Sequence, residues 1–236
     1  MAPLFLVGCA GPVYDVQPLP SKELEKHVNA CRTLVLSIKP ADAEAMMTSH
    51  KLPLDKNSQI ILGSAAPISP DGYFLTANHV VSGEKGNEFV LIYDVAGSRQ
   101  YGRATVVWKD GHADLAVLRS TLKTPDFYTF TPRGKDLSAG TQVLHAGMAT
   151  GNKAQIGELS ERVPGRGSGN FQHTLRLAPG DSGGPVLLFS GELVGVNSAV
   201  GYFTALDTTF FSASRSSRPD PRMIQKIIDE DSSHQP

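Results

Sequence analysis

The chain has 236 residues, of which 40% are hydrophobic and 19% charged, so it holds enough apolar material for a core and too little charge for a disordered chain. Its formal net charge of −1 lacks the basic excess that neutralises phosphates, so we expect no nucleic-acid partner. No stretch approaches the roughly 20 apolar residues that span a bilayer. The 23 glycines and 16 prolines favour many tight turns, which are typical of all-β proteins.

The N-terminal segment 1–20 reads as an irregular tail or tether. Residues 6–9, Leu-Val-Gly-Cys, resemble a bacterial lipobox, in which the cysteine is lipidated and becomes the mature N-terminus. The secretory signal is incomplete, because no Lys or Arg precedes Cys9. We keep two interpretations: membrane attachment through a lipidated Cys9, or a frayed tail. With Cys31 as the other cysteine, the chain has no disulfide framework.

Next along the chain, residues 22–30 predict a short helix with Ser21 as its N-cap. Residues 31–39 predict a first strand, and a short helix is expected around 43–47. From residue 58 onward, short apolar runs alternate with turn signals such as Pro-Asp-Gly at 70–72. These runs predict strands at 60–66, 73–76, 88–95, 101–108, 115–118, 141–146, 154–162, 174–177, 185–189, 192–199 and 202–207.

The two sets of strands favour an all-β fold of two packed barrels, about 31–122 and about 127–211, within one domain at 21–215. A C-terminal helix and tail are expected at 219–236. Asp220 can cap this helix, Pro221 suits its first turn, and its apolar residues share one face.

The strongest motif is the segment 180–185, Gly-Asp-Ser-Gly-Gly-Pro. A serine hydroxyl becomes a good nucleophile when a base takes its proton, so we expect Ser182 on a tight turn beside such a base. In that turn the backbone N–H groups of Gly180 and Ser182 can face one point and form an oxyanion hole. Read alone, the segment could also be an ordinary glycine-rich turn.

Candidates for the base and its orienting acid come from two further motifs. His79 lies in Thr-Ala-Asn-His-Val-Val, directly after the predicted strand 73–76. Asp114 precedes the apolar strand 115–118, where a partly buried carboxylate needs a partner such as an imidazole N–H. The chain's other three histidines in this region are expected to be structural: His112, His145 and His173.

At these motifs the chain resembles the trypsin/chymotrypsin superfamily of serine peptidases, and within it the bacterial branch of HtrA-like proteases. The order His, Asp, Ser is that of chymotrypsin-type enzymes. The segment 191–199, Gly-Glu-Leu-Val-Gly-Val-Asn-Ser-Ala, adds to the likeness. The resemblance implies two perpendicular six-stranded barrels with a C-terminal helix, and a catalytic triad of His79, Asp114 and Ser182 in a cleft between them.

The resemblance also implies how a polypeptide substrate binds. Ser198, with Ala199 and Val200 beside it, is a candidate for the strand that pairs with the substrate backbone. Arg176 stands six residues before the serine, where the family's pocket floor lies, and an inward arginine there would favour an acidic P1 residue. Strand alternation also allows Arg176 to point to solvent.

Three departures from the family pattern matter. The disulfides of secreted animal members are absent, which is typical of a bacterial chain. No cleavage site followed by Ile-Val-Gly-Gly is present, so Asp181, whose trypsin counterpart pairs with the new N-terminus, needs another partner. Because little chain follows Ser182, we expect no PDZ domain.

The sequence therefore predicts an extracytoplasmic serine endopeptidase that needs no cofactor or metal. Alternatives are a protease-fold binding module at the cell surface that is weakly active or inactive, an esterase, or a protease that processes itself or a single target. The sequence leaves the oligomeric state open.

Overall fold

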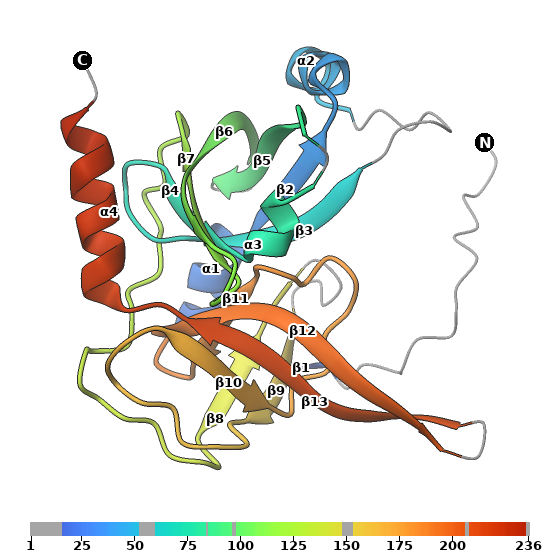
Figure 1. Cartoon of the computed structure of the whole chain (residues 1–236), viewed down its shortest axis with the longest axis vertical. Coiled ribbons are helices and arrows are strands. Elements are labelled where there is room, and N and C mark those ends of the chain that lie inside the picture. The colour runs from blue at the N-terminus through green and yellow to red at the C-terminus, as the bar shows by residue number, and fades with distance from the viewer. Residues whose placement is uncertain are drawn as a thin grey trace.

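Two β-sheets stacked one above the other make up most of the molecule in the computed structural model (Figure 1). The structure describes residues 16–51, 60–83, 85–95, 98–147, 153–205 and 208–234. The strands are β1 (Val16–Gln17), β2 (Thr33–Ile38), β3 (Ile61–Pro67), β4 (Tyr73–Thr76), β5 (Glu88–Val95), β6 (Ser98–Asp110), β7 (Leu115–Ser120), β8 (Gln142–His145), β9 (Ala154–Glu158), β10 (Gly169–His173), β11 (Pro185–Leu188), β12 (Leu193–Ala205) and β13 (Thr208–Arg218). The helices are α1 (Lys22–Ala30), α2 (Pro40–Ser49), α3 (Asn78–Val81) and α4 (Pro221–Ser233).

The upper sheet is a closed barrel with the strand order β2-β3-β4-β7-β6-β5. All residues of β2 and β4 are buried, including the polar Thr33, Ser37 and Thr76, so both faces of these strands are covered. Phe74, Tyr93 and Leu118 lie in the hydrophobic cluster of this barrel. His79 lies shortly after β4, and Asp114 lies directly before β7, the antiparallel partner of β4, so both stand at the same end of the barrel.

The lower sheet has seven strands in the order β1-β9-β8-β11-β12-β13-β10, and β1 is only two residues long. The ends of β9 and β10 also meet. The Thr174 N–H donates to the Glu158 carbonyl at 3.0 Å, and the Ser160 N–H donates to the Gln172 carbonyl at 2.9 Å. The sheet therefore curls back on itself, and the expected all-β double barrel is confirmed.

The helices follow their capping signals. The Ser21 hydroxyl accepts a hydrogen bond from the Leu24 N–H at 3.1 Å at the start of α1. Asp220 accepts from the Arg222 N–H at 2.9 Å at the start of α4, which confirms the C-terminal helix. From β13 of the lower sheet, α4 runs up the side of the upper barrel (Figure 1). None of the helices in the described ranges is long and apolar enough to cross a membrane.

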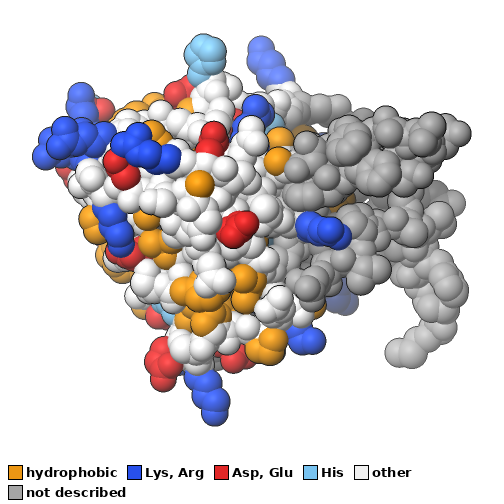
Figure 2. All heavy atoms as spheres, turned by 90° about the horizontal axis from the view of Figure 1, so that it is seen from below, with side chains coloured by type: hydrophobic (Ala, Val, Ile, Leu, Met, Phe, Trp, Pro, Cys, Tyr) orange, Lys and Arg blue, Asp and Glu red, His pale blue; other side chains and the backbone are white. Residues whose placement is uncertain are grey.

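Charges on the described part of the lower face are mixed in sign. Figure 2 shows acidic and basic side chains interspersed there, with small apolar patches between them. Such a surface fits the near-zero net charge, because neither sign has an excess to gather into one field.

Two strand predictions were wrong and two strands were not predicted, one of them β1, in the segment read as an irregular tail. The strand expected at 174–177 lies earlier, as β10 (Gly169–His173), because 174–177 turns into the loop that carries Ser182. The runs 192–199 and 202–207 belong largely to one strand, β12, which continues through Val200 and Gly201. The other unpredicted strand is β13, which is rich in serine and extends to Arg218, beyond the barrel end expected near 211.

Candidate active site

His79 and Asp114 form a two-point contact at the rim of the upper barrel. His79 Nδ1 lies 2.9 Å from Asp114 Oδ2, and the His79 backbone N–H donates to Asp114 Oδ1 at 2.9 Å. His79 sits on α3, which follows β4 directly, and Asp114 directly precedes β7, the partner of β4. The pairing of β4 with β7 thus brings together two residues that are far apart in sequence.

The backbone at Asp114 is unusual, with φ at 51° in the left-handed region. Aspartate tolerates this region better than most residues, because its short polar side chain can hydrogen-bond locally. The preceding turn is held by Asp110, whose carboxylate accepts from the His112 N–H at 2.8 Å and the Ala113 N–H at 3.2 Å. This turn aims the Asp114 carboxylate at His79.

The charge of Asp114 is stabilised by its donors. Burial raises the pKa of Asp114, but the hydrogen bonds from His79 and Ser198 outweigh burial and hold the pKa below its usual value. Since Nδ1 of His79 faces a carboxylate, it carries the hydrogen, and Nε2 keeps its lone pair. The His79 side chain is 47% exposed, so Nε2 is within reach of other groups.

Ser198 supplies a contact that the motifs did not indicate. Its hydroxyl donates to Asp114 Oδ2 at 2.5 Å, and the residue is buried. Ser198 lies at an irregularity of β12, where the pairing with β13 shifts between Asn197 and Ala199. A bulge of this kind re-aims a side chain, here from the lower sheet toward the upper barrel.

The loop that carries Ser182 is tied to both sheets. The Ser64 N–H on β3 donates to the Ser182 carbonyl at 2.7 Å, and the Ser64 hydroxyl donates to the Gly180 carbonyl at 2.7 Å. The Gly183 N–H donates to the Asn197 carbonyl on β12 at 2.7 Å. Gly183 has φ at 80°, and a Cβ there would overlap with Thr76 and β3, so only glycine fits this approach.

Ser182 itself is partly exposed and lies near the helix of His79. A Cβ on Gly63 of β3 would stand 3.1 Å from the Ser182 carbonyl oxygen and 2.6 Å from the side chain of Val80, the residue after His79. Ser182 and α3 therefore flank the same residue of β3.

Two backbone donors of this loop are unused. Within the described residues, the N–H groups of Gly180 and Ser182 donate no hydrogen bond, while that of Asp181 between them donates to the Ala178 carbonyl at 3.0 Å. Both residues are partly exposed, so these two donors, one on each side of Asp181, are open to an acceptor from outside the loop.

The remaining predicted site residues are spread out. Arg176 is exposed, between the buried Leu175 and Leu177, and lines a surface hollow with Gln155, Ile156 and Thr174. Ala199 is exposed and its backbone pairs with Arg215, and Val200 pairs through its backbone with Ser214. Cys9 lies outside the described residues.

The other histidines differ among themselves. His112 is exposed on the turn before Asp114, whereas His145 and His173 are fully buried. Burial lowers the pKa of His173 to about 3, so it is neutral in the core. Over the part of the chain that the structure describes, no group of three or more His, Cys, Asp or Glu residues is placed to hold a metal ion.

Comparisons with known proteins agree with this geometry. The model of the trypsin-like peptidase domain matches residues 63–196. The chain is 34% identical over 144 residues to a probable periplasmic serine endoprotease DegP-like of Rhizobium meliloti (strain 1021), covering 58% of this chain and 28% of that protein. A protein of the same description from Chlamydia pneumoniae is 30% identical over 152 residues, covering 61% of this chain and 30% of the relative. The chain thus spans less than a third of the length of these curated relatives.

Solved structures share the fold. A variant of the HtrA-type protease AlgW with a tripeptide aligns with a TM-score of 0.58 at 21% identity, over 89% of this chain and 64% of that one. AlgW with a decapeptide aligns with the same TM-score at 22% identity, over 87% of this chain and 67% of that one. The matched segment contains the motifs of His79, Asp114 and Ser182, and the chain belongs to the family of trypsin-like peptidase domains.

Proposed function

We propose that the protein is a serine endopeptidase in which Ser182 is the nucleophile, His79 the general base and Asp114 the orienting acid. The observation that carries the proposal is the two-point contact between His79 and Asp114, which leaves His79 Nε2 as a proton acceptor. The loop of Ser182 is anchored beside the helix of His79. A serine in reach of such a base is activated for attack on a carbonyl.

The chemistry follows from these groups. Ser182 Oγ attacks the scissile carbonyl carbon, and its proton moves to His79 Nε2 while Asp114 stabilises the imidazolium. The negative charge on the carbonyl oxygen is held by the unused N–H groups of Gly180 and Ser182. His79 then protonates the leaving amine, and water, activated by the same base, hydrolyses the acyl-enzyme.

We propose an extended polypeptide as the substrate, bound along β12. On one side β12 pairs with β13 over most of its length, but on the other β11 pairs with it only between Leu193 and Val196. From Ser198 onward, that second edge is open among the described strands. An extended peptide can add to such an edge through backbone hydrogen bonds, with Ala199 and Val200 as its partners. The similar AlgW structures contain a tripeptide and a decapeptide.

For the residue before the scissile bond, we propose a preference for acidic side chains through Arg176. The hollow that Arg176 lines also contains Gln155, which is buried and whose amide atoms have no hydrogen-bond partner among the described residues. Mass spectrometry of peptide-library products reads out this preference. Cleavage that avoids Asp and Glu at this position would contradict the assignment.

We further propose an extracytoplasmic location, because the curated relatives are named periplasmic. Attachment to the membrane through a lipidated Cys9 stays a proposal that mass spectrometry of the mature N-terminus can test.

The experiment that tests the catalytic assignment is labelling by a fluorophosphonate probe, combined with cleavage of an unstructured protein such as casein. We expect the wild type to label and to cleave, and Ser182→Ala to do neither, since loss of a triad member costs on the order of 10⁴–10⁶ in turnover. Ser190→Ala, which changes an exposed serine on a turn of the same sheet, is the matched control. A folded wild-type protein that does not react with the probe would contradict the proposal and favour a binding module.

A further inference from the structure

A buried ion pair lies directly behind the proposed nucleophile. His145 Nε2, at the end of β8, is 3.1 Å from Asp181 Oδ1, and both side chains are 0% exposed. Asp181 immediately precedes Ser182, and its other carboxylate oxygen accepts from the Ala178 N–H at 2.8 Å. The sequence motifs left Asp181 without a partner, and the structure supplies His145.

The second ring nitrogen of His145 also faces an oxygen. Nδ1 lies 2.9 Å from the Pro185 carbonyl oxygen, which can only accept a hydrogen bond. Asn197 Nδ2 is 3.0 Å from the same nitrogen. The two ends of an amide are assigned from the hydrogen-bond network, so this amide can present its oxygen to Nδ1. With Nε2 against a carboxylate and Nδ1 against a carbonyl, both nitrogens carry hydrogen, and the ring is a cation.

The pair keeps Asp181 ionised inside the protein. Burial raises the pKa of Asp181, but the attraction of His145 at 3.1 Å, together with the hydrogen bond from the Ala178 N–H, outweighs burial and holds the pKa below its usual value. The site has no spare room, because a Cβ on Gly147 would overlap with both Asp181 and His145. A buried carboxylate that loses its partner is strongly destabilised, so the loop would have to move to reach water.

The position of Asp181 sets the direction of the oxyanion donors. Asp181 closes the turn at Ala178 with its backbone N–H and its side chain, and its carbonyl accepts from the Gly184 N–H at 2.9 Å. The unused N–H groups of Gly180 and Ser182 lie on either side of it. We propose that His145 is a positioning residue: as the buried cation that holds Asp181, it keeps the 178–184 loop in the conformation that binds the oxyanion. This role rests on the proposed serine chemistry.

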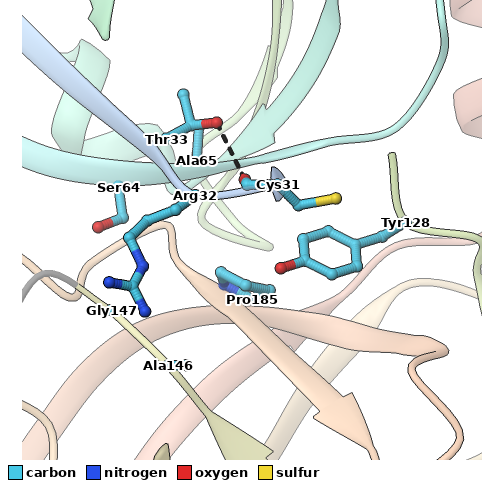
Figure 3. Close-up of a pocket in the computed structure, with 9 residues that line it drawn as sticks. All are labelled: Cys31, Arg32, Thr33, Ser64, Ala65, Tyr128, Ala146, Gly147 and Pro185. Atoms are coloured by element: carbon cyan, nitrogen blue, oxygen red, sulfur yellow. Dashed lines mark hydrogen bonds between the residues drawn. The ribbon is translucent and has the colours of Figure 1, made fainter. Parts of the chain in front are cut away.

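Other groups near the ring come from three elements. Arg32, directly before β2, lines a small cavity of about 10 Å³ between the sheets and points toward Ala146 and Gly147, the residues that follow His145 in the chain (Figure 3). Asn197 lies on β12. His173, on β10, connects to it through Ser216, whose hydroxyl is 2.6 Å from His173 Nε2 and 3.1 Å from the other end of the Asn197 amide. Asp181 is the acidic group in direct contact with His145.

The test measures the rate of fluorophosphonate labelling per folded molecule, well below the unfolding temperature. We expect His145→Gln to label about 10²-fold more slowly, which is the order of magnitude for loss of an oxyanion donor. The double variant His145→Gln/Asp181→Asn leaves no unpaired charge, so it should label at least about tenfold faster than His145→Gln, as expected for directly coupled residues. Thr124→Val, which removes a fully buried hydroxyl from the upper barrel, is the stability control and should label like the wild type.

Two outcomes would overturn the role of His145. One is a His145→Gln variant that labels at the wild-type rate. The other is a double variant that falls by the product of the two single effects, which would mean that the residues act independently.

Nuclear magnetic resonance distinguishes failure of this inference from failure of the proposed function. Two exchange-protected imidazole N–H signals that vanish in His145→Gln would support the cation without any catalytic assay. If they are present and the wild type does not label, the serine chemistry is wrong, and the catalytic role of His145 falls with it. If the wild type labels and these signals are missing, the inference alone is overturned.

Discussion

Ser198 joins the two sheets at the candidate active site. Its hydroxyl donates to Asp114 Oδ2 from a bulge in β12, and its backbone lies where we propose that the substrate binds. Ser198→Ala removes a hydrogen bond to a charged group, worth about 1.5–3 kcal/mol. We expect kcat on a peptide substrate to fall about 10–100-fold with little change in KM, since the substrate contacts are made by the backbone.

Steady-state kinetics of Ser198→Thr provides the control, because threonine keeps the hydroxyl and should recover most of the lost kcat. A KM that rises while kcat stays constant would show that the Ser198 side chain binds substrate instead of supporting Asp114.

At the scale of single residues, a role could be predicted when the neighbouring residues in the sequence form a recognisable motif. His79, Asp114 and Ser182 each stand in a local pattern, and the sequence placed each at a strand end or turn. The contacts of Ser198 and His145 could not be found this way. One depends on a bulge whose register only the folded β12–β13 pair fixes, and the other joins β8 to a loop after β10.

Single elements were predictable where their signals were local. The cap of Ser21, the Pro-Asp-Gly turn and the apolar strands of the upper barrel all appear in the sequence as they do in the structure. The strand β13 was missed because its buried positions include Ser214 and Ser216, whose hydroxyls bind the Leu175 carbonyl and Asn197. A strand that buries serines shows no apolar alternation.

The start of α4 gives a prediction for an element. Asp220 accepts hydrogen bonds from the N–H groups of Arg222 and Gly167 and lies 3.4 Å from Arg133. Burial raises the pKa of Asp220, but these donors hold it below its usual value. We expect Asp220→Ala to cost about 1 kcal/mol of unfolding free energy at neutral pH, the usual effect of losing an N-cap.

The pH dependence has a definite sign. A carboxyl whose pKa is lowered by folding stabilises above its unfolded pKa, near 3.8, and loses that contribution as the pH falls through the folded pKa. The difference between wild type and Asp220→Ala, measured by urea unfolding, should therefore shrink below about pH 4. Asp220→Asn keeps a capping oxygen and is the control. A difference that is constant from pH 3 to pH 7 would refute the assignment.

At the scale of the whole molecule, the candidate site depends on how the two sheets are held together. His79 and Asp114 belong to the upper barrel, while Ser182, Ser198 and His145 belong to the lower sheet. One hydrophobic cluster spans both: it contains Leu75 of β4, Leu187 of β11 and Ile224 of α4. Any movement of the sheets would separate Ser198 from Asp114, so the core that joins them also preserves the catalytic geometry.

Helix α4 contacts both sheets on the outside of the molecule and helps to hold them together. It leaves the lower sheet after β13, and near its end Asp231 accepts hydrogen bonds from the Tyr73 hydroxyl at 2.8 Å and from Arg119 at 3.0 Å, both on the upper barrel. Ile224, which is 1% exposed, packs between these two attachments. The helix therefore connects the two sheets: it follows β13 of the lower sheet in the chain, and its end forms polar contacts with the upper barrel.

Replacing Ile224 with alanine should weaken the packing of α4 and of the shared core together. We expect Ile224→Ala to lower the unfolding free energy by about 2–5 kcal/mol, the usual cost of a large-to-small change in a core. Because one cluster spans both sheets, unfolding should stay a single transition by near-ultraviolet circular dichroism and by loss of fluorophosphonate labelling. Lys226→Ala, on the exposed face of the same helix, should change the free energy by less than about 0.5 kcal/mol. If Ile224→Ala instead lost labelling at a lower denaturant concentration than it lost its fold, the sheets would separate before they unfold, and α4 would act as the clamp of the active site more than as part of the core.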